Sequence, residues 1–221
     1  MANEKKVEGP HQGQPVYTAG VALETAKAAM VMIHGRGGTA ESILALIDAI
    51  GTPGFAYLAP QASGNTWYPN SFLAPIPANE PGISSGLQLI DEIVASLESA
   101  GIEANRIMLL GFSQGACLTL EYAARHARRY GGVCGLSGGV IGPDETPRDY
   151  AGTFAGTPVF LGCSDVDAHI PKKRVEETAA ILKRMKAEVT MRIYPGMGHL
   201  VNEDEIAEVK RMMTAVSGSD R

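Results

Sequence analysis

Ser113 stands between two glycines in the stretch GFSQG, directly after the apolar residues 107–110. The stretch has the form G-x-S-x-G, which acquires chemical meaning where a strand turns sharply into a helix. An apolar run before Ser113 and a helical pattern after it satisfy that condition. Both flanking positions require glycine, because a side chain at either would collide with the adjoining strand or helix. The pattern predicts Ser113 as a nucleophile, with a helix N-cap as the simpler alternative.

A serine hydroxyl reacts at neutral pH only beside a general base, and His199 is the histidine best placed for that role. It ends the glycine-rich loop YPGMGH after the last predicted strand, at the same carboxyl edge of the sheet as Ser113. The other histidines fit less well, because they lie in the N-terminal tail (His11), before a glycine turn (His34), within a helix (His126) and in the loop of candidate acids (His169). We therefore predict His199 as the base.

An acid that orients the histidine should follow the preceding strand, where Asp165 and Asp167 stand in the loop SDVDAHIP. Either aspartate could instead form a turn or begin the next helix. Asp167 lies further along the loop, where reaching His199 is easier, but the spacing separates the two aspartates only weakly. The chain order serine, aspartate, histidine is the one that accompanies a nucleophile on a strand-turn-helix motif.

A tetrahedral intermediate also needs N–H donors for its oxyanion, and the loop HGRGG at residues 34–38 can present backbone amides. This loop follows an apolar run at residues 28–33. We predict the N–H of Gln114, next to the nucleophile, as one donor and the N–H of Arg36 as the other. A phosphate-binding loop is the alternative, but HGRGG lacks both the G-x-G-x-x-G spacing and a P-loop lysine.

The elements that must position these side chains follow from the alternation of short apolar runs with helical patterns, which predicts βαβ units and a mostly parallel sheet. Strands are expected at residues 16–19, 28–33, 55–59, 107–110, 132–136, 159–162 and 189–194. Helices are expected at residues 40–50, 83–100, 114–128, 171–186 and 202–216. Strands that are apolar on both faces indicate a central sheet covered by helices on both sides.

The length of the chain indicates one domain. Its 221 residues, 45% of them hydrophobic, can bury a single sizeable core. Residues 16–216 are expected to form that domain, with flexible tails at 1–15 and 217–221. Two long segments without a clear period, 60–82 and 138–157, are rich in Pro, Gly, Asn and Ser, and loops of such length are usually functional.

The composition excludes several classes of function. The formal net charge is -5 and the basic residues are scattered, so the chain offers no basic face to a nucleic acid. The cysteines, Cys117, Cys134 and Cys163, lie in apolar stretches and lack the spacing of a disulfide framework or a zinc site. Neither a signal-peptide core nor an apolar run of membrane-spanning length is found, so we expect no membrane insertion and a cytoplasmic location.

Four motifs in the same chain order resemble those of a known family. They are HGRGG at residues 34–38, GFSQGA around Ser113, the D-x-x-x-P from Asp167 to Pro171, and the GMGH that ends at His199. From about Pro15 onward the chain is similar to the phospholipase/carboxylesterase group of the α/β-hydrolase fold, which includes acyl-protein thioesterases. The resemblance favours Asp167 as the catalytic acid. It implies hydrolysis of carboxylic esters or thioesters. The predicted serine, histidine and aspartate need neither a cofactor nor a metal for this reaction, and the expected partners are a small-molecule ester and a second copy of the chain in a homodimer.

The same resemblance points to residues that contact the substrate. Gly37 and the segment NTWYPNSF at residues 65–72 look like the family's substrate side, where Trp67, Tyr68 and Phe72 would line the acyl pocket. A place in the core is the alternative for the aromatic pair, but a loop rich in Pro and Asn favours the pocket. HGRGG replaces the HGLGD-like form of the better-known thioesterases, so their preference for lipidated proteins is not carried over. No long helical insertion that could form a lid is visible, which favours an accessible cleft.

Three rival interpretations remain open at this level. A dienelactone-type hydrolase resembles this fold but carries cysteine in place of Ser113. Some proteins of the fold are ligand-binding modules or scaffolds with a broken or slow triad. A metal-dependent hydrolase would need Asp165, Asp167 and His169 as ligands.

Overall fold

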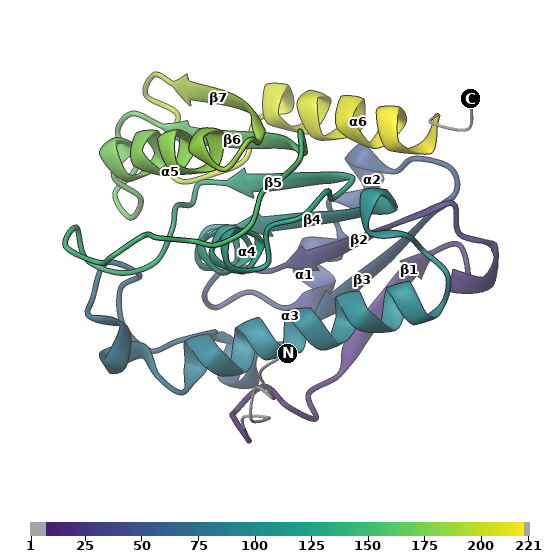
Figure 1. Cartoon of the computed structure of the whole chain (residues 1–221), viewed down its shortest axis with the longest axis horizontal. Coiled ribbons are helices and arrows are strands. Elements are labelled where there is room, and N and C mark those ends of the chain that lie inside the picture. The colour runs from purple at the N-terminus through teal and green to yellow at the C-terminus, as the bar shows by residue number, and fades with distance from the viewer. Residues whose placement is uncertain (1–7, 219–221) are drawn as a thin grey trace.

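The computed structural model describes residues 8–218, and its centre is one seven-stranded sheet (Figure 1). The strand order is β1-β3-β2-β4-β5-β6-β7, with β1 antiparallel to β3 and the other neighbouring pairs parallel. The strands are β1 (Val16–Gly20), β2 (Ala28–Ile33), β3 (Phe55–Pro60), β4 (Ile107–Phe112), β5 (Gly132–Leu136), β6 (Pro158–Ser164) and β7 (Glu188–Tyr194). The predicted single domain with a mostly parallel central sheet is confirmed.

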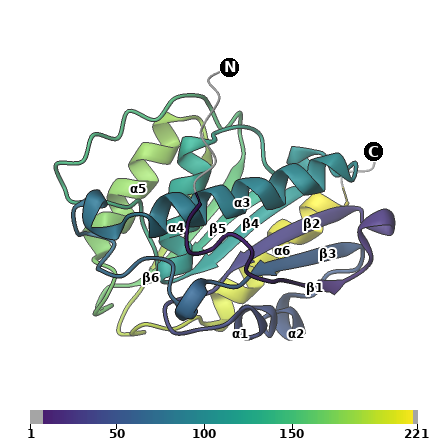
Figure 2. The same ribbon diagram turned by 90° about the horizontal axis from the view of Figure 1, so that it is seen from below.

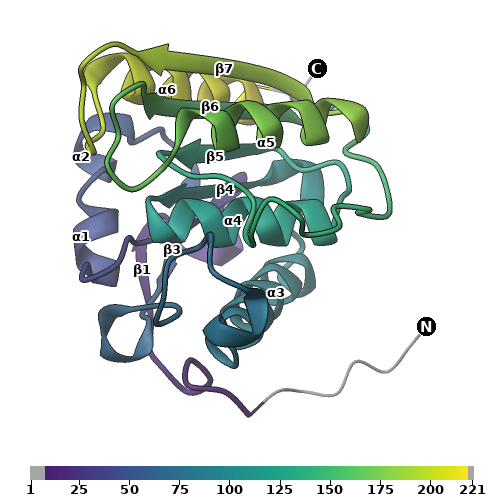
Figure 3. The ribbon, with the colours of Figure 1, turned by 90° about the vertical axis from the view of Figure 1, so that its left-hand side faces the viewer.

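Helices cover both faces of this sheet, as Figures 2 and 3 show, with α3, α4 and α5 on one face and α1, α2 and α6 on the other. Their bounds are α1 (Ala40–Leu44), α2 (Ile47–Ile50), α3 (Gly82–Ser99), α4 (Gln114–Arg125), α5 (Lys172–Arg184) and α6 (Glu203–Ser217). Short 3-10 helices lie at Leu23–Thr25, Ser63–Asn65, Ile76–Asn79 and Ala104–Arg106. Every residue of β2, β3 and β5 is buried, because helices pack on both sides of these strands.

The single helix predicted at residues 40–50 is wrong, because the chain forms two short helices there. Ala45 and Leu46 keep right-handed helical dihedrals, but the N–H of Leu46 pairs with the carbonyl of Ile43 rather than that of Ser42. This tighter turn separates α1 from α2. The apolar spacing of the sequence is the same on both sides of the break, so periodicity alone could not locate it.

The flexible tail predicted at residues 1–15 is also wrong for its second half. Residues 1–7 lie outside the described part, but His11 is 1% exposed. Its main-chain N–H donates to Ser85 Oγ (2.9 Å), so the segment is docked on α3. At the other end α6 extends to Ser217, and residues 219–221 lie outside the described part.

The described part of the chain contains no helix that is both long and apolar enough to span a bilayer. Cys117, Cys134 and Cys163 are free and buried, as the apolar surroundings of each predicted.

Candidate active site

Ser113 occupies the turn between β4 and α4, where its backbone takes the left-handed values φ 55° and ψ -119°. Such a conformation is unfavourable for a residue with a side chain, and it persists only where the surroundings enforce it. A Cβ at Gly111 would overlap the carbonyl of Gly115, and a Cβ at Gly115 would overlap the carbonyl of Ile33. The two glycines therefore let the strand, the turn and the helix approach closely enough to present Ser113.

Ser113, His199 and Asp167 lie in one hydrogen-bonded row. His199 Nε2 is 2.8 Å from Ser113 Oγ, and His199 Nδ1 is 2.7 Å from Asp167 Oδ2. Asp167 Oδ1 accepts from the main-chain N–H groups of His169 (2.8 Å) and Ile170 (3.0 Å). Burial alone would raise the pKa of Asp167, but the hydrogen bonds from His199 and from the two N–H groups lower it. An ionised Asp167 accepts a hydrogen bond from the N–H at Nδ1, so Nε2 carries no proton and can accept from the serine hydroxyl.

The loop that carries His199 is fixed by the loop that follows β6. Asp165 Oδ1 accepts from the N–H of Gly196 (2.8 Å), and Ser164 Oγ accepts from the N–H of Gly198 (3.0 Å). The two aspartates thus have different positions: Asp167 faces His199, whereas Asp165 supports the backbone of the histidine loop. The sequence left this distinction open, and the resemblance favoured the arrangement that the structure has.

The predicted oxyanion donors lie at the two loops that meet beside Ser113. In the described part of the chain, the N–H groups of Arg36 and Gln114 donate to no protein acceptor. The Gln114 side chain instead binds the segment 65–72, accepting from the N–H of Trp67 (2.9 Å) and donating to the carbonyl of Tyr68 (2.8 Å). These contacts hold that segment against the start of α4.

The Arg36 guanidinium binds the same segment. It donates to the carbonyls of Tyr68 (2.9 Å), Pro69 (3.0 Å) and Asn70 (2.7 Å). The predicted substrate contact of Gly37 is not found, since Gly37 donates its N–H to the carbonyl of Asn65 (2.7 Å) and does not line the cleft described next.

A cleft of about 440 Å³ opens beside the serine, and we call it the Ser113 cleft. Its walls include Ser113, His199 and Gln114, with Tyr68 and Phe72 among the residues of segment 65–72. Both predicted residues therefore line the cleft, although little of either is exposed (2% of Tyr68 and 5% of Phe72). A cavity of about 410 Å³ at the amino ends of β6 and β7 is nearly as large, but it lies at the opposite edge of the sheet from Ser113.

The predicted position of Trp67 in the pocket wall is wrong, because its side chain belongs to the core. Trp67 is fully buried, and its indole N–H donates to the carbonyl of His34 (2.8 Å). Its ring packs against His11 and His34, with ring centroids 5.0 and 5.1 Å away. Burial lowers the pKa of both histidines and outweighs their main-chain hydrogen bonds, which keeps them neutral partners of Trp67.

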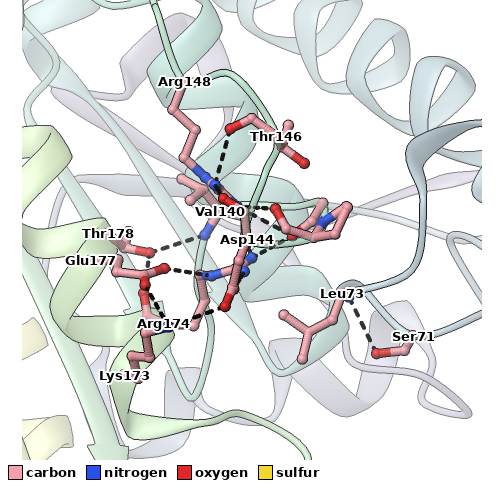
Figure 4. A network of polar contacts seen from close by, with 12 residues as sticks. Ser71, Leu73, Val140, Asp144, Thr146, Arg148, Lys173, Arg174, Glu177 and Thr178 are labelled. Atoms are coloured by element: carbon pink, nitrogen blue, oxygen red, sulfur yellow. Dashed lines mark hydrogen bonds and ion pairs between the residues drawn. The ribbon is translucent and has the colours of Figure 1, made fainter.

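The long loop at residues 138–157 contacts segment 65–72, and a buried arginine holds this loop in place (Figure 4). Arg174, 2% exposed, donates to the carbonyls of Val140 and Gly142 and to the carboxylate of Asp144. Gly142 in turn donates its N–H to the carbonyl of Phe72 (2.8 Å). Sequence reasoning missed Arg174, because it follows two lysines in a helix and has the pattern of an exposed charged turn.

Two rival chemistries find little support in this geometry. Burial raises the pKa of Cys117 to about 12, so its thiol is a poor nucleophile at neutral pH. Within residues 8–218, no three His, Cys, Asp or Glu side chains are grouped so that they could hold a metal ion.

Comparisons with known proteins agree with the fold and show the family. The model of the phospholipase/carboxylesterase family matches residues 21–217. Acyl-protein thioesterase 1 of Debaryomyces hansenii is 26% identical over 91% of this chain and 97% of its own length. The same-named protein of Gibberella zeae is 29% identical over 60% of this chain, and the match spans only 57% of that protein.

Among solved structures, a phospholipase/carboxylesterase from Dyadobacter fermentans superposes with a TM-score of 0.88 and 45% identity. The match covers 91% of this chain and 96% of that one. Because the family model spans nearly all of the described residues, the chain belongs to the phospholipase/carboxylesterase family of α/β-hydrolases.

Proposed function

We propose that this protein is a serine hydrolase that cleaves small to medium carboxylic esters or thioesters through an acyl-enzyme on Ser113. One observation carries the proposal: a single row of hydrogen bonds links Ser113 Oγ, His199 and Asp167 at 2.8 and 2.7 Å. Membership of an ester-hydrolysing family supports it. The Ser113 cleft of about 440 Å³ suits a substrate of modest size.

The row of side chains gives each residue a defined part in the reaction. His199 Nε2 takes the proton of Ser113 as Oγ attacks the carbonyl carbon, and Asp167 stabilises the imidazolium that results. The N–H groups of Arg36 and Gln114 donate to the oxyanion of the tetrahedral intermediate. His199 then gives its proton to the departing alcohol or thiol, which leaves the acyl group on Ser113.

Water completes the cycle by the same route. His199 takes a proton from the water as its oxygen attacks the acyl-serine, and a second oxyanion forms at the same N–H groups. Collapse of this intermediate returns the proton to Ser113 Oγ and releases the acid. The proposed partner is therefore a small-molecule ester or thioester, and the cycle needs no cofactor.

Replacement of the serine tests the proposal. Ser113→Ala should fold normally and lower the turnover of nitrophenyl butyrate by at least about 10⁴-fold, since a triad acts as a unit. Ser96→Ala is the matched control, because Ser96 is an exposed serine of α3 that does not line the Ser113 cleft. Turnover of Ser113→Ala at the wild-type rate would remove Ser113 from this role.

A covalent probe separates the enzyme from a binding module. After incubation with a fluorophosphonate, the intact mass of the wild type and of Ser96→Ala should rise by one adduct, and that of Ser113→Ala should not. An inert ligand-binding protein would show no adduct in any of the three.

A further inference from the structure

The walls of the Ser113 cleft carry a positive charge although the chain as a whole is acidic. The chain carries a formal net charge of -5, yet no Asp or Glu is among the described residues that line the cleft. Arg36 lines it and supplies a formal positive charge. The Asp167 carboxylate behind His199 has no exposed side-chain surface, and it is occupied by His199 and two main-chain N–H groups.

The Arg36 guanidinium is held in place by neutral groups only. Its three hydrogen bonds go to main-chain carbonyls, and within residues 8–218 it forms no ion pair with a carboxylate. Carbonyls leave the positive charge uncompensated. A guanidinium has five N–H donors, so two remain without a protein acceptor in the described part of the chain.

This arrangement prepares Arg36 to meet an anion. Its side chain is exposed, and three hydrogen bonds already fix the planar group, so binding an anion orders little more of it. The carbonyls that hold it belong to residues 68–70, which line the cleft together with Phe72. The family resemblance places the acyl pocket along this segment, so the guanidinium lies on the side expected for the acyl group.

We infer that the preferred substrates carry an anionic group in the acyl part, as do half-esters and half-thioesters of short dicarboxylic acids, with the carboxylate facing Arg36. This inference rests on the proposed function, because it names the acyl group that Ser113 would accept. The positive charge of Arg36, among neutral walls, attracts an anionic substrate into the cleft. It also slows dissociation of that substrate, because the carboxylate would have to leave the guanidinium for water.

Two substrates of the same shape and different charge test the inference. Ethyl hydrogen succinate ends in a carboxylate, and ethyl succinamate ends in the isosteric neutral amide. With ethanol release as the measurement, kcat/KM of the wild type for the half-ester should exceed that for the amide by about fivefold to tenfold at low salt. The ratio should fall by at least about half in about 0.5 M NaCl, because salt screens an exposed charge.

Substitutions of Arg36 locate the cause of the preference. Arg36→Gln should slow both substrates, since segment 65–72 loses its hydrogen bonds, but the half-ester to amide ratio should fall to about one and lose its salt dependence. Arg36→Lys keeps the charge and should retain part of the preference. Lys210→Gln removes one positive charge from the exposed face of α6 and should behave as the wild type.

The outcomes distinguish this inference from the function on which it rests. If the wild type hydrolyses nitrophenyl butyrate but does not prefer the half-ester, or if Arg36→Gln keeps the preference, the inference is wrong and the hydrolase stands. If the wild type cleaves neither nitrophenyl butyrate nor the ethyl esters and forms no fluorophosphonate adduct, the proposed function itself is wrong. Should Arg36→Gln fail to fold, the salt dependence of the wild type and the ratio of Arg36→Lys decide the question.

Discussion

Glu205 is a buried carboxyl group beneath the strand that leads to Asp167. Its Oε2 accepts from the N–H of Asn202 (2.9 Å), the residue that caps α6 just after the His199 loop. Its Oε1 has no partner among the described residues and lies so close to Gly162 on β6 that a Cβ there would overlap it. Burial raises the pKa of Glu205 to about 7, the hydrogen bond from Asn202 opposes the rise, and the charge of Asp204 adds to it.

The size of this effect follows from the two pKa values. Each pKa unit corresponds to about 1.4 kcal/mol, so a rise from 4.5 to about 7 makes charging Glu205 cost about 3 kcal/mol of folding free energy. Because the folded state holds the proton more tightly, this contribution lowers stability as the pH rises from about 4.5 to about 7. Above pH 7 both states are ionised and the full cost remains.

The buried histidines make the protein more stable as the pH rises, which is opposite to the effect of Glu205 over part of the same pH range. The folded state keeps His11 and His34 neutral, with pKa values below 6.5, so their contribution to stability grows as the pH rises toward 6.5. The stability of the wild type against pH is therefore a sum of opposing slopes. The difference between the wild type and Glu205→Gln isolates the carboxyl group, since the amide imitates the neutral acid at every pH.

Urea unfolding from about pH 4.5 to about pH 8 measures that difference. The stability of Glu205→Gln relative to the wild type should improve by about 3 kcal/mol across the range, whatever constant offset the amide introduces. Glu203→Gln, which changes an exposed acid in the first turn of the same helix, should show no comparable trend. A difference between Glu205→Gln and the wild type that changes by less than about 0.5 kcal/mol across this pH range would refute the reasoning.

Two substitutions in the site give further predictions. Asp167→Asn should lower kcat for nitrophenyl butyrate by about 10⁴-fold, with little change in KM. The reason is that an amide facing Nδ1 stabilises the wrong tautomer of His199. A loss of kcat below about tenfold would contradict the role of Asp167. Phe72→Ala should move the optimum in a series of nitrophenyl esters toward longer acyl chains, because it removes a ring from the wall of the Ser113 cleft. An unchanged chain-length profile would place the acyl group elsewhere.

The sheet and the reactive side chains could be predicted because each depends on a local pattern. β2 and β5 have the predicted bounds, since each is one apolar run between polar turns. Ser113 and His199 follow different parallel strands, and the carboxyl ends of such strands share one edge of a sheet. Their placement in one neighbourhood therefore needed only the strand assignment.

The side chains that support the site could not be predicted, because their contacts join distant parts of the chain. Trp67 stands in a loop of polar and Pro residues, which favours the pocket wall over the core, yet its ring is fully buried and packs against His11 and His34. His11 is 56 residues away in sequence, in a segment whose composition is typical of a tail. No local pattern reports that Arg174 will bind the loop that contacts Phe72.

The contacts that hold segment 65–72 are made to its main chain, and for that reason the sequence does not predict them. Gln114 and Arg36 bind segment 65–72 through its main-chain groups, and His11 binds the carbonyl of Trp67 (2.8 Å). A main-chain carbonyl is present whatever residue occupies the position, so these contacts leave no signature in the segment itself. They also do not involve the side chain of Phe72. Because segment 65–72 is fixed through its backbone, a substitution at Phe72 can change the shape of the Ser113 cleft. The loop that carries the Arg36 N–H then stays in place.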